Sequence, residues 1–182
     1  MLYMFLANGF EETEAIGALD VIRRAEIEIK TVGVTGKTVT GSHGVEITAD
    51  ILPSEVDCSN MTGVILPGGM PGTTNLFEDK RVTDAVKECF ESGRVVAAIC
   101  AAPMIPGQLG MLRGKKATCF PGFEKYLEGA VLVDAPAVRD GNIITGKGAG
   151  AAMIFGAEIV NFFESGKGDE ILVQMQHLNY KV

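Results

Sequence analysis

The sequence contains no tryptophan, only two histidines and no closely spaced pair of cysteines. Its cysteines are Cys58, Cys89, Cys100 and Cys119. These spacings exclude a CxxC motif, and with His43 and His177 as the only imidazoles a protein-bound metal is not expected. No basic segment precedes the apolar N-terminus, and no apolar run approaches the roughly 20 residues of a membrane span. We therefore expect a cytoplasmic protein with reduced thiols, no cofactor and no membrane segment.

Basic clusters are also missing. The chain has 16 Lys and Arg residues against 23 Asp and Glu residues, a net charge of −7. Pairs of adjacent cations such as Arg23–Arg24 and Lys115–Lys116 do not amount to a cluster, so nucleic-acid binding is not expected. The 47% of hydrophobic residues and the 23 glycines are enough for a buried core with many tight turns. No linker or repeat divides the chain, and we expect one domain over residues 1–182.

Short apolar segments alternate with amphipathic ones along the chain. The apolar segments are typical of strands buried on both faces of a parallel sheet, and they are residues 2–7, 27–34, 63–69, 95–100 and 142–146. Helical patterns cover residues 11–25, 80–93, 151–166 and 168–177. Residues 36–51 alternate β-branched residues with glycines, which predicts a small hairpin excursion. The order predicts an α/β fold, a three-layer doubly wound sandwich around a mostly parallel sheet.

The strongest signal for chemistry is the segment VVAAICAAP, residues 95–103. A buried strand runs directly into Cys100, alanines flank it, and Pro103 suits the first turn of a helix. This is the order of a nucleophile elbow with Cys in place of Ser. The helix N-terminus beside the sulfur predicts a thiol that is ionised at neutral pH. The alternative is a small buried hydrophobic residue, an interpretation that suits the other three cysteines better.

A second strand, VILPGG, ends in the turn Gly68–Gly69. Because ligands bind beyond the carboxyl ends of the strands in such sheets, this turn is expected to line the same crevice as Cys100. There the amide groups of Gly69 and Ala101 can form an oxyanion hole with two donors. The alternative is an ordinary tight turn.

Three acids follow the first strand, and they are Glu11, Glu12 and Glu14. Glu11 and Glu12 suit the positive end of a helix dipole. Glu14 differs because its helix face is apolar, with Phe10, Ala18 and Val21. A carboxyl group that faces a core stays protonated or finds a partner. We therefore predict that Glu14 is held neutral beside the cysteine, donates a hydrogen bond to the thiolate and relays a proton.

Together these motifs resemble the ThiJ/PfpI superfamily, in the branch of the Parkinson disease protein and the YajL-like deglycases. The segments EETEAIGALDVIRRA, VILPGG, VVAAICAAP, FPGFEKYL and GKGAGAAMIFGAEIV follow one another in family order. The resemblance implies a flavodoxin-like fold, an oxidation-prone nucleophile at Cys100 and an acid at Glu14 that hydrogen-bonds to it. It also implies backbone donors at Gly69 and Ala101, and a homodimer whose interface includes the helix around residues 23–24.

Two departures from the family pattern bear on function. Peptidase-like members carry His directly after the nucleophile, where this chain has Ala101, which argues against proteolysis. Phe120 stands where the Parkinson disease protein has His, as in YajL-like members, and it is expected to line the pocket. The Gly-rich turn with Gly148 and Gly150 lacks the Walker spacing and is assigned to close packing near the same pocket. Neither His43 nor His177 matches a catalytic position of the family.

Two functions fit one site. The first is a cofactor-free, cysteine-dependent glyoxalase or deglycase that converts methylglyoxal, glyoxal or early glycation adducts to hydroxy acids. The second is a redox-sensing, chaperone-like stress protein in which Cys100 is oxidised without significant turnover. A protease- or amidase-like hydrolase is a third and weaker reading. The sequence favours the enzyme over the sensor, because it predicts both a nucleophile and oxyanion donors.

Overall fold

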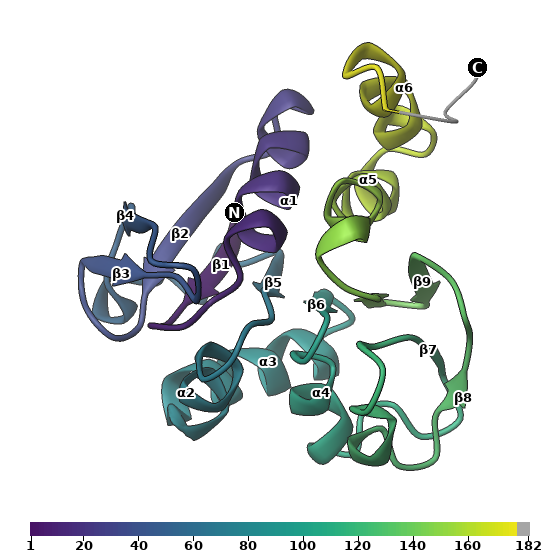
Figure 1. The fold of residues 1–182 in the computed structure, drawn as a ribbon, viewed down its shortest axis with the longest axis horizontal. Coiled ribbons are helices and arrows are strands. Elements are labelled where there is room, and N and C mark those ends of the chain that lie inside the picture. Colours follow the sequence, from purple (N-terminus) through teal and green to yellow (C-terminus); the bar gives the residue numbers. More distant parts are fainter. Residues whose placement is uncertain (178–182) are drawn as a thin grey trace.

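The computed structural model describes residues 1–177 and shows a six-stranded sheet between two layers of helices (Figure 1). From one edge to the other the strands are β2 (Ile29–Gly33), β1 (Leu2–Leu6), β5 (Gly63–Leu66), β6 (Val95–Ile99), β10 (Ile143–Gly146) and β9 (Ala137–Asp140). The first five strands pair in parallel, and β9 is antiparallel to β10. Apart from β9 this is the strand order of flavodoxin-like sheets. The predicted fold class is confirmed.

The helices cover both faces of the sheet (Figure 1). One face carries α1 (Glu12–Arg24), α5 (Ala152–Phe163) and α6 (Lys167–Gln174). The other carries α2 (Gly72–Glu78), α3 (Lys80–Glu91) and α4 (Met104–Gln108). Successive side chains of a strand point to opposite faces, so in β1 Met4 packs in the α1 layer and Phe5 in the α3 layer. Burial on both faces explains why the strand segments are apolar throughout.

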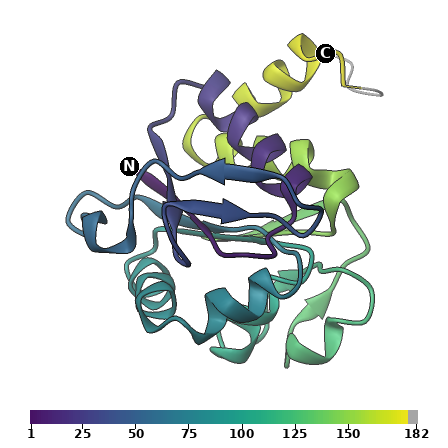
Figure 2. The ribbon, with the colours of Figure 1, turned by 60° about the vertical axis from the view of Figure 1, so that its left-hand side comes forward.

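Smaller elements lie outside the main sheet. The predicted hairpin is present as the antiparallel pair β3 (Thr38–Thr40) and β4 (Glu46–Thr48), seen side by side in Figure 2. The strands β7 (Lys116–Ala117) and β8 (Val131–Leu132) form a second short ladder. Three single turns of 3₁₀ helix cover Pro53–Glu55, Glu124–Tyr126 and Ala149–Ala151.

The predicted helices and strands agree with the structure to within a few residues at their ends. Gly93 and Gly166 follow α3 and α5 in the left-handed region, with φ of 69° and 85°, as helix stop signals do. The sequence did not predict α2, β7, β8 or β9, because these elements are short and carry no clear apolar period. Among the described residues, none of the helices combines the length and apolar character that crossing a membrane requires.

Candidate active site

Cys100 stands directly after β6 in a strained backbone conformation. Its φ is 65°, in the left-handed region that costs a residue with a Cβ about 1–2 kcal/mol. Two hydrogen bonds hold this conformation: the Cys100 amide donates to the Gly146 carbonyl and the Phe120 amide donates to the Cys100 carbonyl, each at 2.9 Å. The sharp turn takes the side chain out of the strand direction. The structure therefore has the backbone geometry of a nucleophile elbow.

The helix after the elbow is short. It begins at Met104, contains five residues and has Pro103 as its N-cap, so the cysteine is separated from it by the turn at residues 101–103. Pro103 was expected in the first turn of this helix, and it lies one residue before it, at the N-cap. Gly107 is required inside α4 because a Cβ there would lie 2.3 Å from the Tyr126 carbonyl oxygen. So short a helix adds little dipole stabilisation to a nearby thiolate.

The amide groups of Gly69 and Ala101 are directed at the sulfur of Cys100. Each donates a hydrogen bond to the thiolate and thereby lowers the pKa of the thiol. Gly69 has a φ of 88°, and a Cβ there would lie 2.4 Å from the Glu11 nitrogen, so the turn needs glycine. The structure thus brings together Cys100 and both amide donors suggested by the sequence. They come from the ends of neighbouring strands, β5 and β6.

Glu14 projects from α1 into the same site. Its side chain is 1% exposed, and Oε2 accepts a 2.8 Å hydrogen bond from the Gly68 amide. Its own amide donates to Glu11 Oε2 at 2.7 Å, which makes Glu11 the N-cap of α1. Oε1 is buried, and among the described residues it has no hydrogen-bond partner of standard geometry. Burial raises the pKa of Glu14 to about 7, although the Cys100 thiol and the Gly68 amide both favour the carboxylate.

The thiol of Cys100 is not ionised by its surroundings at neutral pH. Its pKa is raised to about 12, mainly by burial. The charge and hydrogen bond of Glu14 also raise it, and together they outweigh the two amides, which lower it. The prediction of a thiolate stabilised by a helix N-terminus is therefore wrong. The physical reason is the buried carboxyl group beside the sulfur, because two adjacent groups in an apolar site cannot easily both be negative. Near pH 7 the sulfur therefore keeps its proton, and Glu14 gains or loses a second one.

An apolar pocket of about 440 Å³ lies beside the elbow. Its walls include Phe120, Gly148 and Gly150, three of the predicted lining residues. The Phe120 side chain is 48% exposed, and a Cβ at Gly148 would meet its ring at 3.3 Å. Gly68, the fourth predicted lining residue, is not part of this pocket. It lies against Cys100 and Glu14 instead, since a Cβ there would be 2.6 Å from the Cys100 Cβ and 2.7 Å from Glu14 Oε2.

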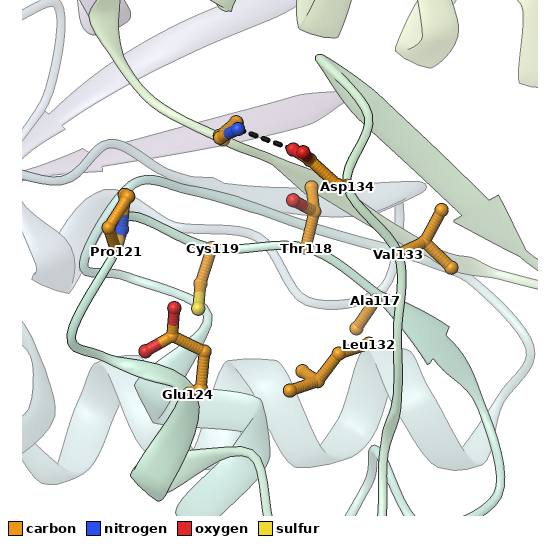
Figure 3. A pocket seen from close by; sticks show the side chains of 9 residues that line it. Ala117, Thr118, Cys119, Pro121, Glu124, Leu132, Val133 and Asp134 are labelled. Atoms are coloured by element: carbon orange, nitrogen blue, oxygen red, sulfur yellow. Dashed lines mark hydrogen bonds and ion pairs between the residues drawn. The ribbon is translucent and has the colours of Figure 1, made fainter.

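The other cysteines are not among the groups that act on the Cys100 thiol. Cys89 and Cys119 are buried, as expected of small hydrophobic residues, but Cys58 is exposed, so that interpretation is wrong for Cys58. Cys119 lines a separate pocket of about 370 Å³, where its sulfur lies near Glu124 (Figure 3). Burial and the charge of Glu124 raise the pKa of Cys119 to about 11.

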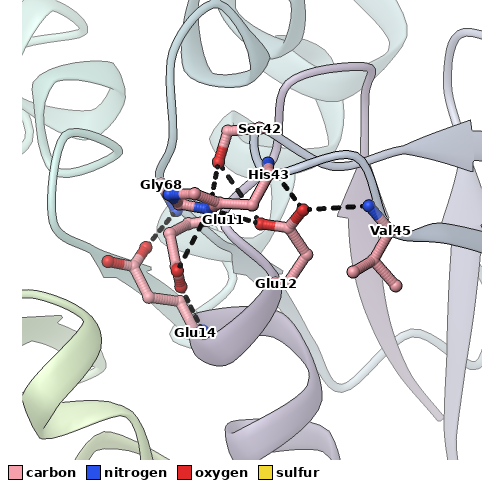
Figure 4. A network of polar contacts seen from close by, with 7 residues as sticks. All are labelled: Glu11, Glu12, Glu14, Ser42, His43, Val45 and Gly68. Atoms are coloured by element: carbon pink, nitrogen blue, oxygen red, sulfur yellow. Dashed lines mark hydrogen bonds and ion pairs between the residues drawn. The ribbon is translucent and has the colours of Figure 1, made fainter.

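Glu12 has a role that its place in a helix did not reveal. Its carboxylate reaches the hairpin turn and accepts hydrogen bonds from the amides of His43 and Val45 and from the His43 ring (Figure 4). Burial alone would raise the pKa of Glu12, but these bonds hold it at about 2. Glu11, Glu12 and His43 are the one trio of possible metal ligands among the described residues, with ligand atoms within 4.8 Å. The oxygens of Glu12 are already occupied by the turn. Partners 31 positions apart leave no spacing signal in the sequence.

Known proteins resemble this chain over most of its length. Residues 1–162 match the DJ-1/PfpI family. The chain belongs to this family. Protein dj-1beta of Drosophila melanogaster is 36% identical over 159 residues, which cover 86% of this chain and 85% of that protein. The crystal structure of Drosophila melanogaster DJ-1beta superposes with a TM-score of 0.89 over 96% of each chain, at 34% identity.

Other DJ-1/PfpI relatives differ in length and in name. A protein of Pyrococcus horikoshii named a deglycase is 32% identical over 81% of this chain and 90% of its own. Protein DJ-1 homolog B of Arabidopsis thaliana is 38% identical over 85% of this chain, which spans only 36% of that longer protein. The structure titled Toxoplasma gondii DJ-1, oxidized, has a TM-score of 0.92 at 27% identity, covering 97% of this chain and 98% of that one.

Proposed function

We propose that this protein is a cysteine-dependent enzyme of the glyoxalase or deglycase type, with Cys100 as nucleophile and Glu14 as the group that takes its proton. The observation that carries the proposal is the buried Glu14 carboxyl group, with a pKa of about 7, beside a thiol that faces two amide donors. A general base is most effective when its pKa lies near the working pH. The carboxylate therefore replaces the ionised thiol as the source of reactivity.

The first step is addition of the thiol to an aldehyde. The Cys100 sulfur forms a bond to the aldehyde carbon of methylglyoxal while Glu14 accepts the thiol proton. The carbonyl oxygen gains negative charge next to the amides of Gly69 and Ala101. These amides act on the sulfur, so they can also donate hydrogen bonds to an oxygen bound beside it. The proton then passes from Glu14 to this oxygen, which gives a hemithioacetal without loss of any atom and leaves Glu14 ionised for the next step.

The second step converts the adduct to an acid. Glu14 transfers the hydrogen of the former aldehyde carbon, as a proton, to the neighbouring carbonyl carbon, which turns the hemithioacetal into an isomeric thioester. Water then attacks the thioester, the bond to Cys100 breaks, and the thiol recovers its proton as lactate leaves. The net change is addition of one water molecule, so no redox cofactor is needed. An early glycation adduct offers the same carbonyl chemistry to the same sulfur.

The deglycase names of relatives from Pyrococcus horikoshii and Thermococcus kodakarensis support this proposal. Proteolysis has less support, because the groups that act on the Cys100 thiol are Glu14 and two amides, with no imidazole among them.

We also propose a homodimer with the C-terminal part of α1 in its interface. Arg23 and Arg24 are exposed there and pair with Asp50 and Asp20. Light scattering coupled to gel filtration tests this assembly.

A redox-sensing role is the second candidate. The half-buried Cys100 faces two amide donors that can also hold the oxygens of a sulfenate or sulfinate. Mass spectrometry after mild peroxide treatment separates the two roles. Selective oxidation at Cys100 with negligible turnover of dicarbonyls favours the sensor, whereas even oxidation of all four cysteines contradicts it.

The deciding experiment for the enzyme is product analysis. Wild type and Cys100→Ala are incubated with methylglyoxal, glyoxal and a glycated peptide, and the acids formed are identified by mass spectrometry. We expect lactate from methylglyoxal and glycolate from glyoxal with the wild type only. A Cys100→Ala protein that consumes methylglyoxal at the wild-type rate would overturn the proposal.

A further inference from the structure

We propose that Glu12 is a positioning residue for the Cys100–Glu14 pair. The protonation state of the His43 ring sets how strongly Glu12 binds the hairpin turn. This inference deepens the proposed function and rests on it. The Glu12 carboxylate, in the first turn of α1, is the centre of a hydrogen-bond network with the turn at residues 41–45 (Figure 4).

The turn is shaped around this carboxylate. Oε1 of Glu12 accepts from the His43 amide at 2.7 Å and from the Val45 amide at 3.3 Å. Oε2 lies 2.9 Å from His43 Nδ1 and 3.3 Å from the Ser42 hydroxyl. Gly41 leaves the necessary space, because a Cβ there would lie 2.3 Å from the Glu12 carboxyl carbon. One side chain therefore gathers four donors from a separate segment of the chain.

Backbone contacts join the same two segments next to the carboxylate. The Ser42 amide donates to the Phe10 carbonyl at 2.7 Å, and the Gly9 amide donates to the Thr40 carbonyl at 2.8 Å. Residues 9–12 are thus clamped between the hairpin and the body of the protein. Glu12 supplies the charged part of this clamp, and charge-assisted hydrogen bonds are stronger than neutral ones.

Residues 9–12 are hydrogen-bonded to the turn that holds the groups of the active site. The Glu11 amide donates to the Gly68 carbonyl at 2.9 Å, and the Gly68 amide donates to Glu14 Oε2 at 2.8 Å. The next residue, Gly69, supplies an amide donor to Cys100. A tilt of the first turn of α1 would therefore move the Glu14 carboxyl group and the Gly69 amide together. Small displacements of this kind reduce rates because reactivity depends on the placement of the reacting groups.

His43 adds a protonation-dependent contact. Its hydrogen bond to Glu12 raises its pKa, the charge of Glu12 adds to this effect, and Glu11 contributes from 4.0 Å. These two acids of α1 are the charged groups that act on the ring among the described residues. The ion pair is complete below the ordinary pKa of about 6.5, and it is lost as the pH rises through the raised value. The bonds from the two backbone amides remain at every pH, because Glu12 stays ionised.

The test measures the reactivity of Cys100 independently of any substrate. Wild type, Glu12→Gln, His43→Gln and the double variant are alkylated with iodoacetamide between about pH 6 and about pH 9, and the Cys100 peptide is followed by mass spectrometry. We expect Glu12→Gln to slow alkylation about fivefold near pH 9 and by more near pH 6, where the wild type also has the His43 ion pair, and to lower kcat for methylglyoxal with KM unchanged. His43→Gln should match the wild type near pH 9 and fall below it near pH 6. The double variant should equal Glu12→Gln, because both changes remove one contact.

Controls separate this inference from the function on which it rests. Glu46→Gln changes an acid of the same hairpin that bonds to Thr40 rather than to His43, and it should alkylate like the wild type. Wild-type alkylation in Glu12→Gln overturns the positioning role, and a His43→Gln defect of equal size at pH 6 and pH 9 overturns the role of protonation. If no protein turns over dicarbonyls but Glu12→Gln still alkylates slowly, the proposed function fails and the positioning role stands. His43 is 72% exposed, so its variant reports on the network even if Glu12→Gln folds poorly.

Discussion

Glu14 and Gly68 lie 54 positions apart in the sequence, and the Gly68 amide donates a 2.8 Å hydrogen bond to Glu14 Oε2. This bond fixes one carboxyl oxygen and leaves the second without another partner of standard geometry beside the Cys100 thiol. An acid, a glycine turn and a cysteine from three different strand ends thereby become one unit. We expect the reactivity of the sulfur to depend on whether Glu14 carries its proton.

Replacing the carboxyl group by an amide should remove the proton acceptor while keeping the shape. In Glu14→Gln the side-chain oxygen can still accept from the Gly68 amide. We expect kcat for methylglyoxal to fall about 100-fold, the size of a lost general base. Steady-state kinetics measures this, with Asp20→Asn on the exposed side of α1 as control. Activity of Glu14→Gln within a few-fold of wild type would remove Glu14 from the mechanism.

The same carboxyl group should make stability depend on pH. Its pKa is about 7 in the fold against an ordinary 4.5, so the folded state binds the proton more tightly than the unfolded chain. The wild type therefore loses stability as the pH rises from 4.5 to 7, and this cost persists at higher pH. Glu14→Gln has no such cost. Its advantage over the wild type should grow by about 2–3 kcal/mol between pH 5 and pH 8, measured by urea unfolding, and a constant difference would show that Glu14 titrates normally.

Because the backbone at Cys100 is strained, glycine should stabilise the protein at this position rather than destabilise it. Glycine within a strand normally costs about 0.5–1 kcal/mol relative to alanine. At position 100 the φ of 65° favours glycine, so Cys100→Gly should be at least as stable as Cys100→Ala. Ala98→Gly, in the buried part of β6, should be less stable than wild type by about 1 kcal/mol. Thermal unfolding of the three proteins decides whether the elbow is strained.

Gly68 should tolerate no side chain. A Cβ there would lie 2.6 Å from the Cys100 Cβ and 2.7 Å from Glu14 Oε2, so Gly68→Ala has to separate the pair. We expect a loss of about 2 kcal/mol in unfolding free energy, as for other overpacked sites, together with loss of turnover. Gly150→Ala is the stability control, because no atom lies within 4 Å of its added Cβ. Equal stability of the two variants would contradict the described packing.

The sequence was sufficient to predict how Cys100, Glu14, Gly69 and Ala101 come together. Each follows a strand or sits in the first turn after one, and parallel strands end at a common edge, so local pattern determines their meeting place. The ionisation of Cys100 was predicted incorrectly because it depends on burial and on a neighbouring acid, which are properties of distances through space. The contact of Glu12 with the hairpin turn was missed for the same reason. Short elements such as α2 and β9 were missed because few residues carry their pattern.

We propose that Cys100 becomes reactive when Glu14 loses its proton. The pH dependence of Cys100 carbamidomethylation in wild type and Glu14→Gln, read on the Cys100 peptide alone, measures this. We expect a wild-type midpoint at about 7 that disappears in Glu14→Gln, where only a slow rise toward high pH remains. A wild-type midpoint between about 8 and about 9, the range of an ordinary thiol, and unchanged in the variant, would contradict it.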